Sequence, residues 1–327
     1  MRRGTTVLQA LAGAACAVLL ASCGTTEPVA GDVADEPAAQ VEVSDREAED
    51  DPTDEKNIEL EPAAEEEPVE EAGFDASAPV TDVTSDYGID VTAPEGFLDT
   101  PEYVALEDEI ASLADAGYSV SVRMIDVETG RGVSYNADVA RYPASAIKAA
   151  YCAAICETYG GSAGWSQTMA QCLINSANDA YTTLIRTFGL SLLTSWLSAN
   201  DAPGAAAEAP SHYYPDITAE ELANVWLEIW RYGTSGEAGA DELASYLSQT
   251  DYTPMGALLR DECEVWAKPG WYPADENNLT STNDAGVVFS DDGTYVLVVM
   301  TDLSADLDRL TPLIDALDAA HDVMCGG

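Results

Sequence analysis

The stretch RYPASAIKAAY, Arg141–Tyr151, places Ser145 three residues before Lys148 at the predicted start of a helix. Pro143 favours an end to the segment before it, and the alanine-rich run that follows favours a helix. On a helix, residues i and i+3 lie on one face, so the hydroxyl and the amine are neighbours. The positive N-terminal end of the helix dipole stabilises an alkoxide and disfavours an ammonium. The pair is therefore a candidate nucleophile and base.

Lysine is otherwise almost absent from this chain. It occurs three times, at Lys56 in an acidic tract, at Lys148 and at Lys268. The structural alternative for an S-x-x-K pattern is an N-cap serine beside a surface lysine. The pattern alone does not exclude that alternative, so the interpretation depends on what else the sequence contains.

Two later motifs complete the pattern. INSANDAY contains Ser176 and Asn178, and WAKPGW contains Lys268 and Gly270. The order S-x-x-K, S-x-N, K-x-G matches the three-part signature of penicillin-binding proteins and class A β-lactamases. From about Val120 onward the chain resembles the class A β-lactamase-like serine hydrolases, which have the penicillin-recognising fold. The segments RMIDVETGRGVSYNADVARYPASAIKAAY and STNDAGVVFSDDGTYVLVVMTD are similar to that family's opening hairpin with its nucleophile helix and to its final hairpin.

The resemblance implies the roles of the catalytic residues. Ser145 would be the acylated nucleophile and Lys148 its proton partner, while Ser176 would pass a proton to the leaving nitrogen. Lys268 would attract the substrate carboxylate and tune Ser176. The oxyanion hole, which holds the negative oxygen of the tetrahedral intermediate, would be the backbone N–H groups of Ser145 and Trp271.

The resemblance also implies a set of substrate-binding residues, and two of the motifs depart from the family pattern. Asn178 would bind the substrate amide side chain or steady the lysines, and Gly270 and Trp271 complete this set. Pro269 stands where the family usually has Thr or Ser, which removes a hydroxyl that would bind the substrate carboxylate. Pro in a strand predicts a sheet edge. Ala177 replaces Asp in the second motif, which is a milder change.

The largest departure concerns the step that releases the product. Class A enzymes carry a glutamate in an E-x-x-L-N setting that activates the deacylating water. The corresponding segment here, residues 200–218, reads NDAPGAAAEAPSHYYPDIT and lacks that motif. Glu208 is its only glutamate and is not expected to be the base, and His212 is expected to pack among Tyr213 and Tyr214. We therefore expect slow hydrolysis that is limited by deacylation.

Hydrophobic periodicity predicts an α/β (α+β) fold, with a five-stranded antiparallel sheet, flanking terminal helices and an inserted helical lobe. The predicted strands are residues 118–127, 133–138, 263–271, 283–290 and 294–302, and the terminal helices are 101–117 and 307–324. Most of the segment from Ser145 to about Tyr232 is predicted to be helical. A G-x-S-x-G pattern at Gly160–Gly164 follows a helix rather than a strand, so we interpret it as a loop and not as a nucleophile elbow.

The first 98 residues are predicted to contain no folded domain. Residues 1–22 have the features of a lipoprotein signal peptide, because Arg2 and Arg3 precede the apolar run VLQALAGAACAVLLA, and LASC at Cys23 resembles a bacterial lipobox. Residues 23–98 are predicted to be an acidic disordered tether, since 31–71 alone contain 18 Asp or Glu. The hydrolase domain, 99–327, would then lie at the extracytoplasmic face of the bacterial membrane, anchored through lipid on Cys23.

Charge and cysteine content limit the partners. The net charge of −46 argues against nucleic-acid binding, and we expect a monomer. No Cys/His spacing is typical of zinc, so we expect neither a metal nor a cofactor and interpret His321 as structural. Export permits disulfides. By analogy with some class A enzymes, the resemblance implies a Cys152–Cys172 bridge, with Cys156 as the alternative partner of Cys172.

Two hypotheses for the function follow. The leading one is a lipid-anchored serine hydrolase that is acylated by β-lactams or by the D-alanyl peptides of peptidoglycan. The alternative is a non-catalytic cell-wall-binding or scaffold lipoprotein with a degenerate active site. Pro269 and the missing glutamate favour the alternative, whereas the intact serine, lysine and asparagine residues of the three motifs favour the enzyme.

Overall fold

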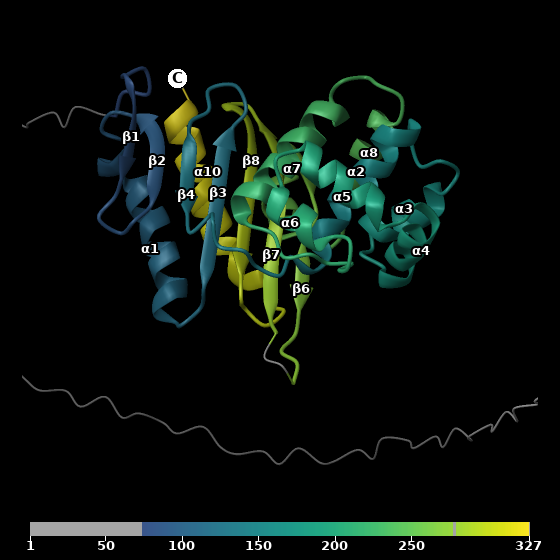
Figure 1. Ribbon diagram of the computed structural model, residues 1–327. Helices are drawn as coiled ribbons and strands as arrows, with labels where there is room; N and C mark the ends of the chain where they lie inside the picture. Colours follow the sequence, from purple (N-terminus) through teal and green to yellow (C-terminus); the bar gives the residue numbers. More distant parts are fainter. Residues whose placement is uncertain (1–73, 277–278, 327) are drawn as a thin grey trace, which may run out of the picture. The chain divides into compact units, whose positions relative to one another are not determined.

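The computed structural model of the protein describes residues 74–276 and 279–326 (Figure 1). The predicted signal peptide, the lipidation site Cys23 and the tether up to residue 73 lie outside the described residues. Within the two described ranges, no helix is both long enough and apolar enough to cross a membrane.

One antiparallel sheet organises the described residues. It contains eight strands in the order β1-β2-β4-β3-β8-β7-β5, and β6 also pairs with β7. The strands are β1 (Val80–Thr84), β2 (Asp90–Pro94), β3 (Val120–Asp126), β4 (Gly132–Tyr135), β5 (Glu264–Ala267), β6 (Gly270–Tyr272), β7 (Ser281–Ser290) and β8 (Gly293–Thr301).

The prediction of five strands was therefore wrong, for two separate reasons. The segment predicted as one strand, 263–271, is divided by Lys268 and Pro269 into β5 and β6, which continue in one register along the same edge of β7. The other two additional strands, β1 and β2, lie inside the segment that was predicted to be part of the disordered tether.

Strands β1 and β2 were missed because their composition is that of a solvated chain. All five residues of β1 are exposed, as expected for a strand at the sheet edge. Threonine and aspartate side chains link the two strands, since Thr84 Oγ1 donates to Asp90 Oδ1 at 2.6 Å and Thr92 Oγ1 donates to Asp82 Oδ1 at 2.7 Å. The apolar contribution comes from alternate residues of β2, and Val91 is buried in the core.

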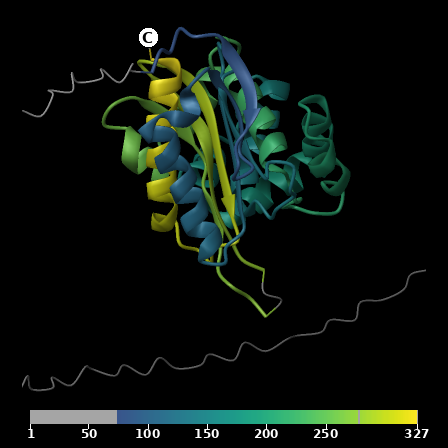
Figure 2. The same cartoon turned by 90° about the vertical axis from the view of Figure 1, so that its left-hand side faces the viewer.

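Two layers of helices cover the two faces of the sheet. Helices α1 (Pro101–Asp115) and α10 (Thr311–Cys325) lie side by side on one face, as predicted for the terminal helices (Figure 2). The inserted helices lie between β4 and β5 in the sequence, and most of them pack on the opposite face. They are α2 (Lys148–Tyr159), α3 (Ser166–Leu173), α4 (Asn178–Phe188), α5 (Leu190–Ala199), α6 (Pro203–Glu208), α7 (Ala219–Gly233), α8 (Ala240–Leu247) and α9 (Pro254–Leu259).

Strand β8 divides the hydrophobic core in two. Val296 and Val298 face the inserted helices, whereas Leu297 and Val299 face α1 and α10. Successive side chains of a strand point to opposite faces, so a strand that is covered on both faces has a continuous apolar run. This explains why YVLVVM contains no polar side chain apart from the tyrosine hydroxyl.

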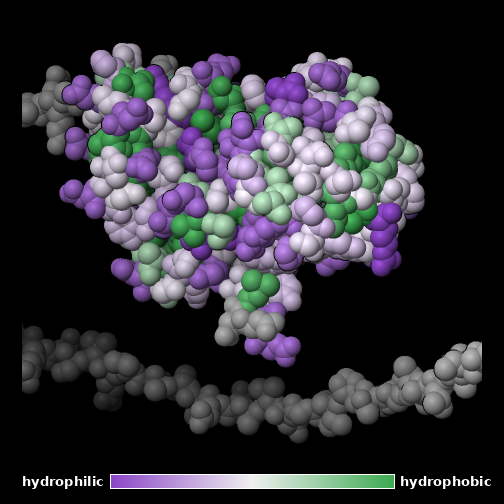
Figure 3. All heavy atoms as spheres, viewed as in Figure 1, coloured by the Kyte–Doolittle hydropathy of each residue, from purple (hydrophilic) through white to green (hydrophobic). Residues whose placement is uncertain are grey.

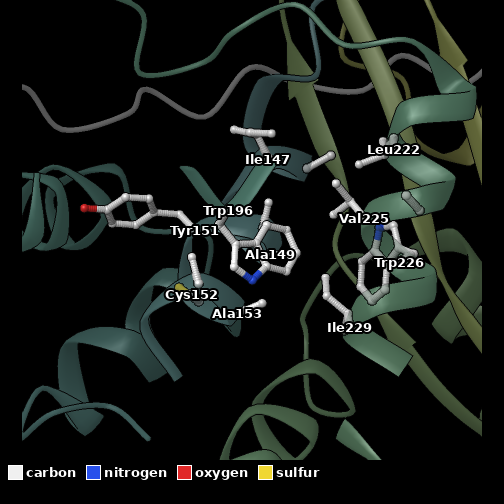
Figure 4. Close-up of a cluster of buried hydrophobic side chains, with 14 of the residues drawn as sticks. Ile147, Ala149, Tyr151, Cys152, Ala153, Trp196, Leu222, Val225, Trp226 and Ile229 are labelled. Atoms are coloured by element: carbon white, nitrogen blue, oxygen red, sulfur yellow. The ribbon is translucent and has the colours of Figure 1, made fainter. Parts of the chain in front are cut away.

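Helix α2 is the centre of the inserted lobe. Nine of its residues, Lys148–Cys156, are buried. Figure 4 shows Ala149 and Ala153 of α2 in one buried cluster with Trp196 of α5 and Trp226 of α7. The alanines of α2 therefore allow these helices to approach it closely, and the core fixes the position of the residues at its N-terminal end. On the face that Figure 3 shows, hydrophilic and hydrophobic residues are interspersed.

Candidate active site

The Ser145–Lys148 pair lies where a short 3-10 helix, η2 (Ala144–Ile147), passes into α2. In a 3-10 helix, residues i and i+3 are eclipsed, so Ser145 and Lys148 lie on one face more directly than an α-helical turn would place them. The backbone N–H of Lys148 donates to the Ser145 carbonyl. Ala144 has φ of 47°, in the left-handed region that non-glycine residues rarely adopt. The serine therefore follows a strained turn rather than capping a helix.

Lys148 is fully buried, which excludes the surface-lysine interpretation. Its Nζ donates to Ser176 O and to Asn178 Oδ1, both at 2.7 Å, and lies 3.5 Å from Ser176 Oγ. Burial lowers the pKa of Lys148 from its usual value, because an ammonium loses its hydration there. Among the hydrogen bonds of the described residues, none joins Lys148 Nζ to the Ser145 hydroxyl.

Ser176 lies in the short connection between α3 and α4, with φ of 57°. This left-handed conformation directs the serine toward both lysines, since its Oγ lies 3.0 Å from Lys268 Nζ as well as 3.5 Å from Lys148 Nζ. Asn178 is the first residue of α4. The structure therefore brings the serine, lysine and asparagine of the second and third motifs to one place.

Lys268 is also fully buried. Its Nζ donates to Pro269 O at 2.9 Å in addition to Ser176 Oγ. Burial, followed by repulsion from the Lys148 ammonium, lowers the pKa of Lys268 to about 7. Lys148 and Lys268 both lie beside the Ser176 hydroxyl, and such a group of residues can transfer protons near neutral pH.

The edge formed by β5 and β6 faces the start of α2. Lys268 N donates to Ala285 O of β7 at 2.8 Å. In an antiparallel pair, only every second residue of a strand directs its N–H to the partner strand. The backbone nitrogens of Pro269 and Trp271 therefore point away from β7. Proline removes no sheet hydrogen bond at that position, and the N–H of Trp271 is free to point toward a substrate.

Gly270 is required at the contact between this edge and the nucleophile. A Cβ at Gly270 would lie 2.8 Å from Ser145 N and 2.2 Å from Pro143 O, which is closer than real contacts allow. The absence of a side chain lets β6 approach the backbone of Ser145 closely. This is consistent with the predicted oxyanion hole.

In the loop of residues 200–218, the hydrogen bonds that Glu208 and His212 make within the described residues are to the loop itself and not to the motif residues. The Glu208 side chain is exposed, and its Oε2 accepts a hydrogen bond from Asp216 N at 3.0 Å. His212 is also exposed, with Nδ1 3.2 Å from Glu208 O, and does not pack as predicted. Both side chains stabilise the loop itself.

Several residues near the site were not identified from the sequence. Tyr214 OH donates to Asn178 Oδ1 at 3.3 Å, and the Tyr214 ring contacts Tyr142, whose ring contacts Tyr272. An aromatic wall thus adjoins the lysines. In the sequence these residues are marked only by their positions. Tyr142 and Tyr272 lie next to motifs, and Tyr214 lies in the 200–218 loop.

Asp284 was also missed. It is fully buried next to the strand segment that carries Lys268, and its Oδ2 accepts hydrogen bonds from Thr253 Oγ1 at 2.7 Å and Met255 N at 2.9 Å. Burial raises its pKa to about 6, although these hydrogen bonds and Lys268 oppose the shift. The carboxylate holds the N-terminus of α9 on the sheet, and it adds negative charge behind Lys268.

The predicted disulfide is not present in the structure. The Sγ atoms of Cys152 and Cys172 lie 3.8 Å apart, far beyond a covalent S–S length of about 2.0 Å, and both are free thiols. Cys156 contacts Met169 rather than Cys172, with the two sulfurs 3.4 Å apart. The prediction that Cys152 and Cys172 are neighbours is correct, because α2 and α3 pack there. The predicted bond between them is absent.

The rival G-x-S-x-G pattern lies in a loop, as predicted. Helix α2 precedes it, and Gly160 ends that helix in the left-handed conformation. No strand leads into the serine, Ser162, so a nucleophile elbow is excluded.

Comparison with known proteins gives the same architecture. A model of the Beta-lactamase enzyme family matches residues 157–320. The TLA-1 extended spectrum beta-lactamase is 14% identical, with a TM-score of 0.56 over 69% of this chain and 100% of that one. A class A beta-lactamase from Bacteroides cellulosilyticus is 16% identical, with a TM-score of 0.56 over 70% of this chain and 99% of that one. A beta-lactamase from Streptosporangium roseum is 16% identical, with a TM-score of 0.54 over 68% and 99%. No curated protein matches the chain.

Proposed function

Because the chain belongs to the beta-lactamase enzyme family, we propose that it is a serine hydrolase that forms an acyl-enzyme on Ser145. The observation that carries the proposal is the position of the Ser176 hydroxyl, 3.0 Å from Lys268 Nζ and 3.5 Å from Lys148 Nζ. Two buried amines around one hydroxyl are costly for stability, and a scaffold would have no need of them. Substrates are β-lactams or D-alanyl peptides of peptidoglycan.

In the proposed reaction, Lys148 and Ser176 each end in the protonation state in which they began. Ser145 Oγ attacks the carbonyl carbon of the substrate, and neutral Lys148 takes the hydroxyl proton. The C–N bond then breaks, its electron pair goes to nitrogen, and Ser176 Oγ–H donates the proton that the nitrogen needs. The Lys148 ammonium returns a proton to Ser176, which leaves an ester on Ser145. Water hydrolyses this ester in a second step.

We further propose that the chain is exported and anchored through lipid on Cys23. The support is the sequence alone, namely the LASC segment after a short apolar run. The negative charge of the chain after this segment is compatible with a solvated tether. Metabolic labelling with a fatty-acid probe tests this, because Cys23→Ser should abolish the label.

Mass spectrometry after treatment with penicillin tests the acylation. We expect one penicilloyl adduct on Ser145, no adduct in Ser145→Ala, and acylation slowed on the order of a hundredfold or more in Lys148→Ala. Ser166→Ala, on the neighbouring helix α3, serves as the matched control and should react normally. If neither β-lactams nor acyl-peptide probes label Ser145, the non-catalytic cell-wall-binding function replaces this one.

A further inference from the structure

A second cluster of reactive side chains lies far from Ser145. Asp126 ends β3, and His321 and Cys325 lie on the last turns of α10. Asp126 is opposite Tyr295 of β8, whereas the β7 residues beside the active site are opposite Met300 and Thr301. Five or six residues of strand separate the two places, or roughly 15–20 Å. The cluster also lies on the sheet face that α10 covers rather than on that of α2.

The members of this cluster are close together and held rigidly. One potential ligand atom from each of Asp126, His321 and Cys325 lies within 4.8 Å of the others. His321 Nε2 is 3.2 Å from Asp126 Oδ2, and both residues are at most 2% exposed. The Asp126 Oδ1 atom is occupied by Thr129, which donates to it from N at 2.7 Å and from Oγ1 at 2.6 Å. The imidazole stacks on Tyr295, with ring centroids 4.1 Å apart.

The two ring nitrogens of His321 face different carboxylates. Nε2 faces Asp126, whereas Nδ1 lies 3.8 Å from Asp322 Oδ1, beyond a hydrogen bond, although the side chain is completely buried. Among the described residues, Nδ1 has no hydrogen-bond partner, and such buried polar atoms are rare. A metal on Nε2 would fix the ring with its proton on Nδ1, directed at Asp322.

The surroundings attract cations. A pocket of about 210 Å³ adjoins the cluster and includes Asp322 in its wall. Its other charged lining residues are all acidic, namely Glu262, Asp291, Asp292 and Asp318. Such a pocket concentrates positive ions beside Asp322, although Asp126, His321 and Cys325 are not among its lining residues.

We propose that Asp126 Oδ2, His321 Nε2 and Cys325 Sγ bind a zinc-type divalent metal ion. A carboxylate oxygen, an imidazole nitrogen and a thiolate are the donors that Zn²⁺ prefers. In tetrahedral coordination with bonds of about 2.0–2.1 Å, oxygen and nitrogen ligands lie about 3.3 Å apart, close to the observed 3.2 Å. Asp322 orients the imidazole from the second ring nitrogen, as carboxylates do in many histidine–metal sites.

Binding balances charge and releases protons. Carboxylate, thiolate, neutral imidazole and a divalent cation sum to zero, which suits a buried site. A metal ion binds the deprotonated thiolate, so binding releases the thiol proton and affinity rises with pH. The site joins the end of β3 to the end of α10, residues that are 195 positions apart in the chain.

Cobalt(II), a spectroscopic substitute for zinc, tests the proposal on the full chain. We expect one equivalent of Co²⁺ to produce a thiolate-to-metal charge-transfer band that Zn²⁺ abolishes. The band should disappear in Cys325→Ser and persist in Cys263→Ser, a matched control because Cys263 lines the same acidic pocket and is also partly buried. Zinc should raise the melting temperature of the native chain by on the order of 5 °C and leave that of Cys325→Ser unchanged.

Two results would overturn the proposal. One is the absence of a charge-transfer band in the native chain, and the other is a band that survives in Cys325→Ser or depends on Cys263. Cys325 is near the end of the chain and partly exposed, so its variant is expected to fold, and circular dichroism checks this. His321→Gln provides a second test, in which binding is lost while penicillin acylation of Ser145 is retained.

Discussion

At the scale of single residues, the site depends on how two amines share one environment. Lys148 and Lys268 both approach Ser176 Oγ, and neither is exposed. Because two ammonium groups repel each other, the presence of one proton makes the second easier to lose. Burial lowers the pKa of both lysines, and repulsion from Lys148 adds to the shift at Lys268, so the neutral amine becomes more accessible.

Lysine-specific NMR measures this coupling directly, since the chain contains only three lysines. Lys268 should titrate at about pH 7, being an ammonium below that pH and neutral above it. In Lys148→Met the repulsion is lost, so the pKa of Lys268 should rise, while Lys56 is the internal reference. A pKa of Lys268 that is unchanged in this variant would show that burial alone, and not the pair, causes the shift.

Pro269 offers a second test at a single position. Because its nitrogen points away from β7, threonine can replace it without altering the sheet, and the new hydroxyl can bind a substrate carboxylate. In Pro269→Thr we expect acylation by a carboxylate-bearing β-lactam to become about tenfold faster, the effect of one hydrogen bond to a charged group. Acylation by the matching neutral ester should not change, and an equal gain for both would contradict the assigned role.

The sequence predicted the motif residues of the site but not the residues that support them. Ser145, Lys148, Ser176, Asn178 and Lys268 were identified because their order and spacing are distinctive. The structure brings the last four into contact, and Ser145 lies one turn before Lys148. Asp284 and Tyr214 were missed because one buried aspartate or one loop tyrosine has no local pattern. Their significance comes from contacts between residues distant in sequence.

At the scale of elements, the decisive contact is between the β6 edge and the 3-10 turn before α2. Gly270 is the residue that lets them meet. The same closeness makes the contact intolerant of change, because a well-packed contact cannot absorb an additional methyl group without moving the backbone.

Gly270→Ala tests the importance of this contact. We expect a loss of about 2 kcal/mol or more of unfolding free energy, together with much slower acylation, because the Trp271 N–H moves away from Ser145 N. Gly236→Ala is the control, since a Cβ there meets no atom within 4 Å and only its positive φ is disturbed. If the Gly270 variant is destabilised but acylates at the native rate, the oxyanion hole lies elsewhere.

Prediction of the elements succeeded where apolar periodicity was strong and failed where it was weak. Helix α1 and strand β8 have clear patterns, and the structure confirms both. Strand β1 has no buried residue, so no hydrophobic pattern marked it. The break between β5 and β6 lies where Lys268 contacts Ser176, 92 residues away in the sequence. A pattern within the strand itself cannot predict such a long-range contact.

At the scale of the whole molecule, the groups proposed for acylation are in place, whereas no group has been assigned to deacylation. Lys148 and Lys268 are fully buried, but the 200–218 loop directs its glutamate to its own backbone. We expect a burst of β-lactam hydrolysis equal to the enzyme concentration, followed by slow turnover, as acyl-enzyme accumulates.

Stopped-flow kinetics with a chromogenic β-lactam would reveal this burst. Glu208→Gln should leave both phases unchanged, because the structure gives this side chain a role in the loop only. Fast steady turnover without a burst would show that another group activates the water. A longer acyl-enzyme lifetime in Glu208→Gln would identify Glu208 as that group.

The burial of Lys148 and Lys268 has a practical consequence. In the described residues these are the only lysines, and neither presents any surface to solvent. An amine-reactive reagent can therefore modify the folded domain only when the region around Ser176 opens. The rate of labelling reports the free energy of that local opening, so the two lysines are a built-in probe of local unfolding at the proposed active site. A covalently bound β-lactam should slow the labelling, which would separate closure of the site from global unfolding.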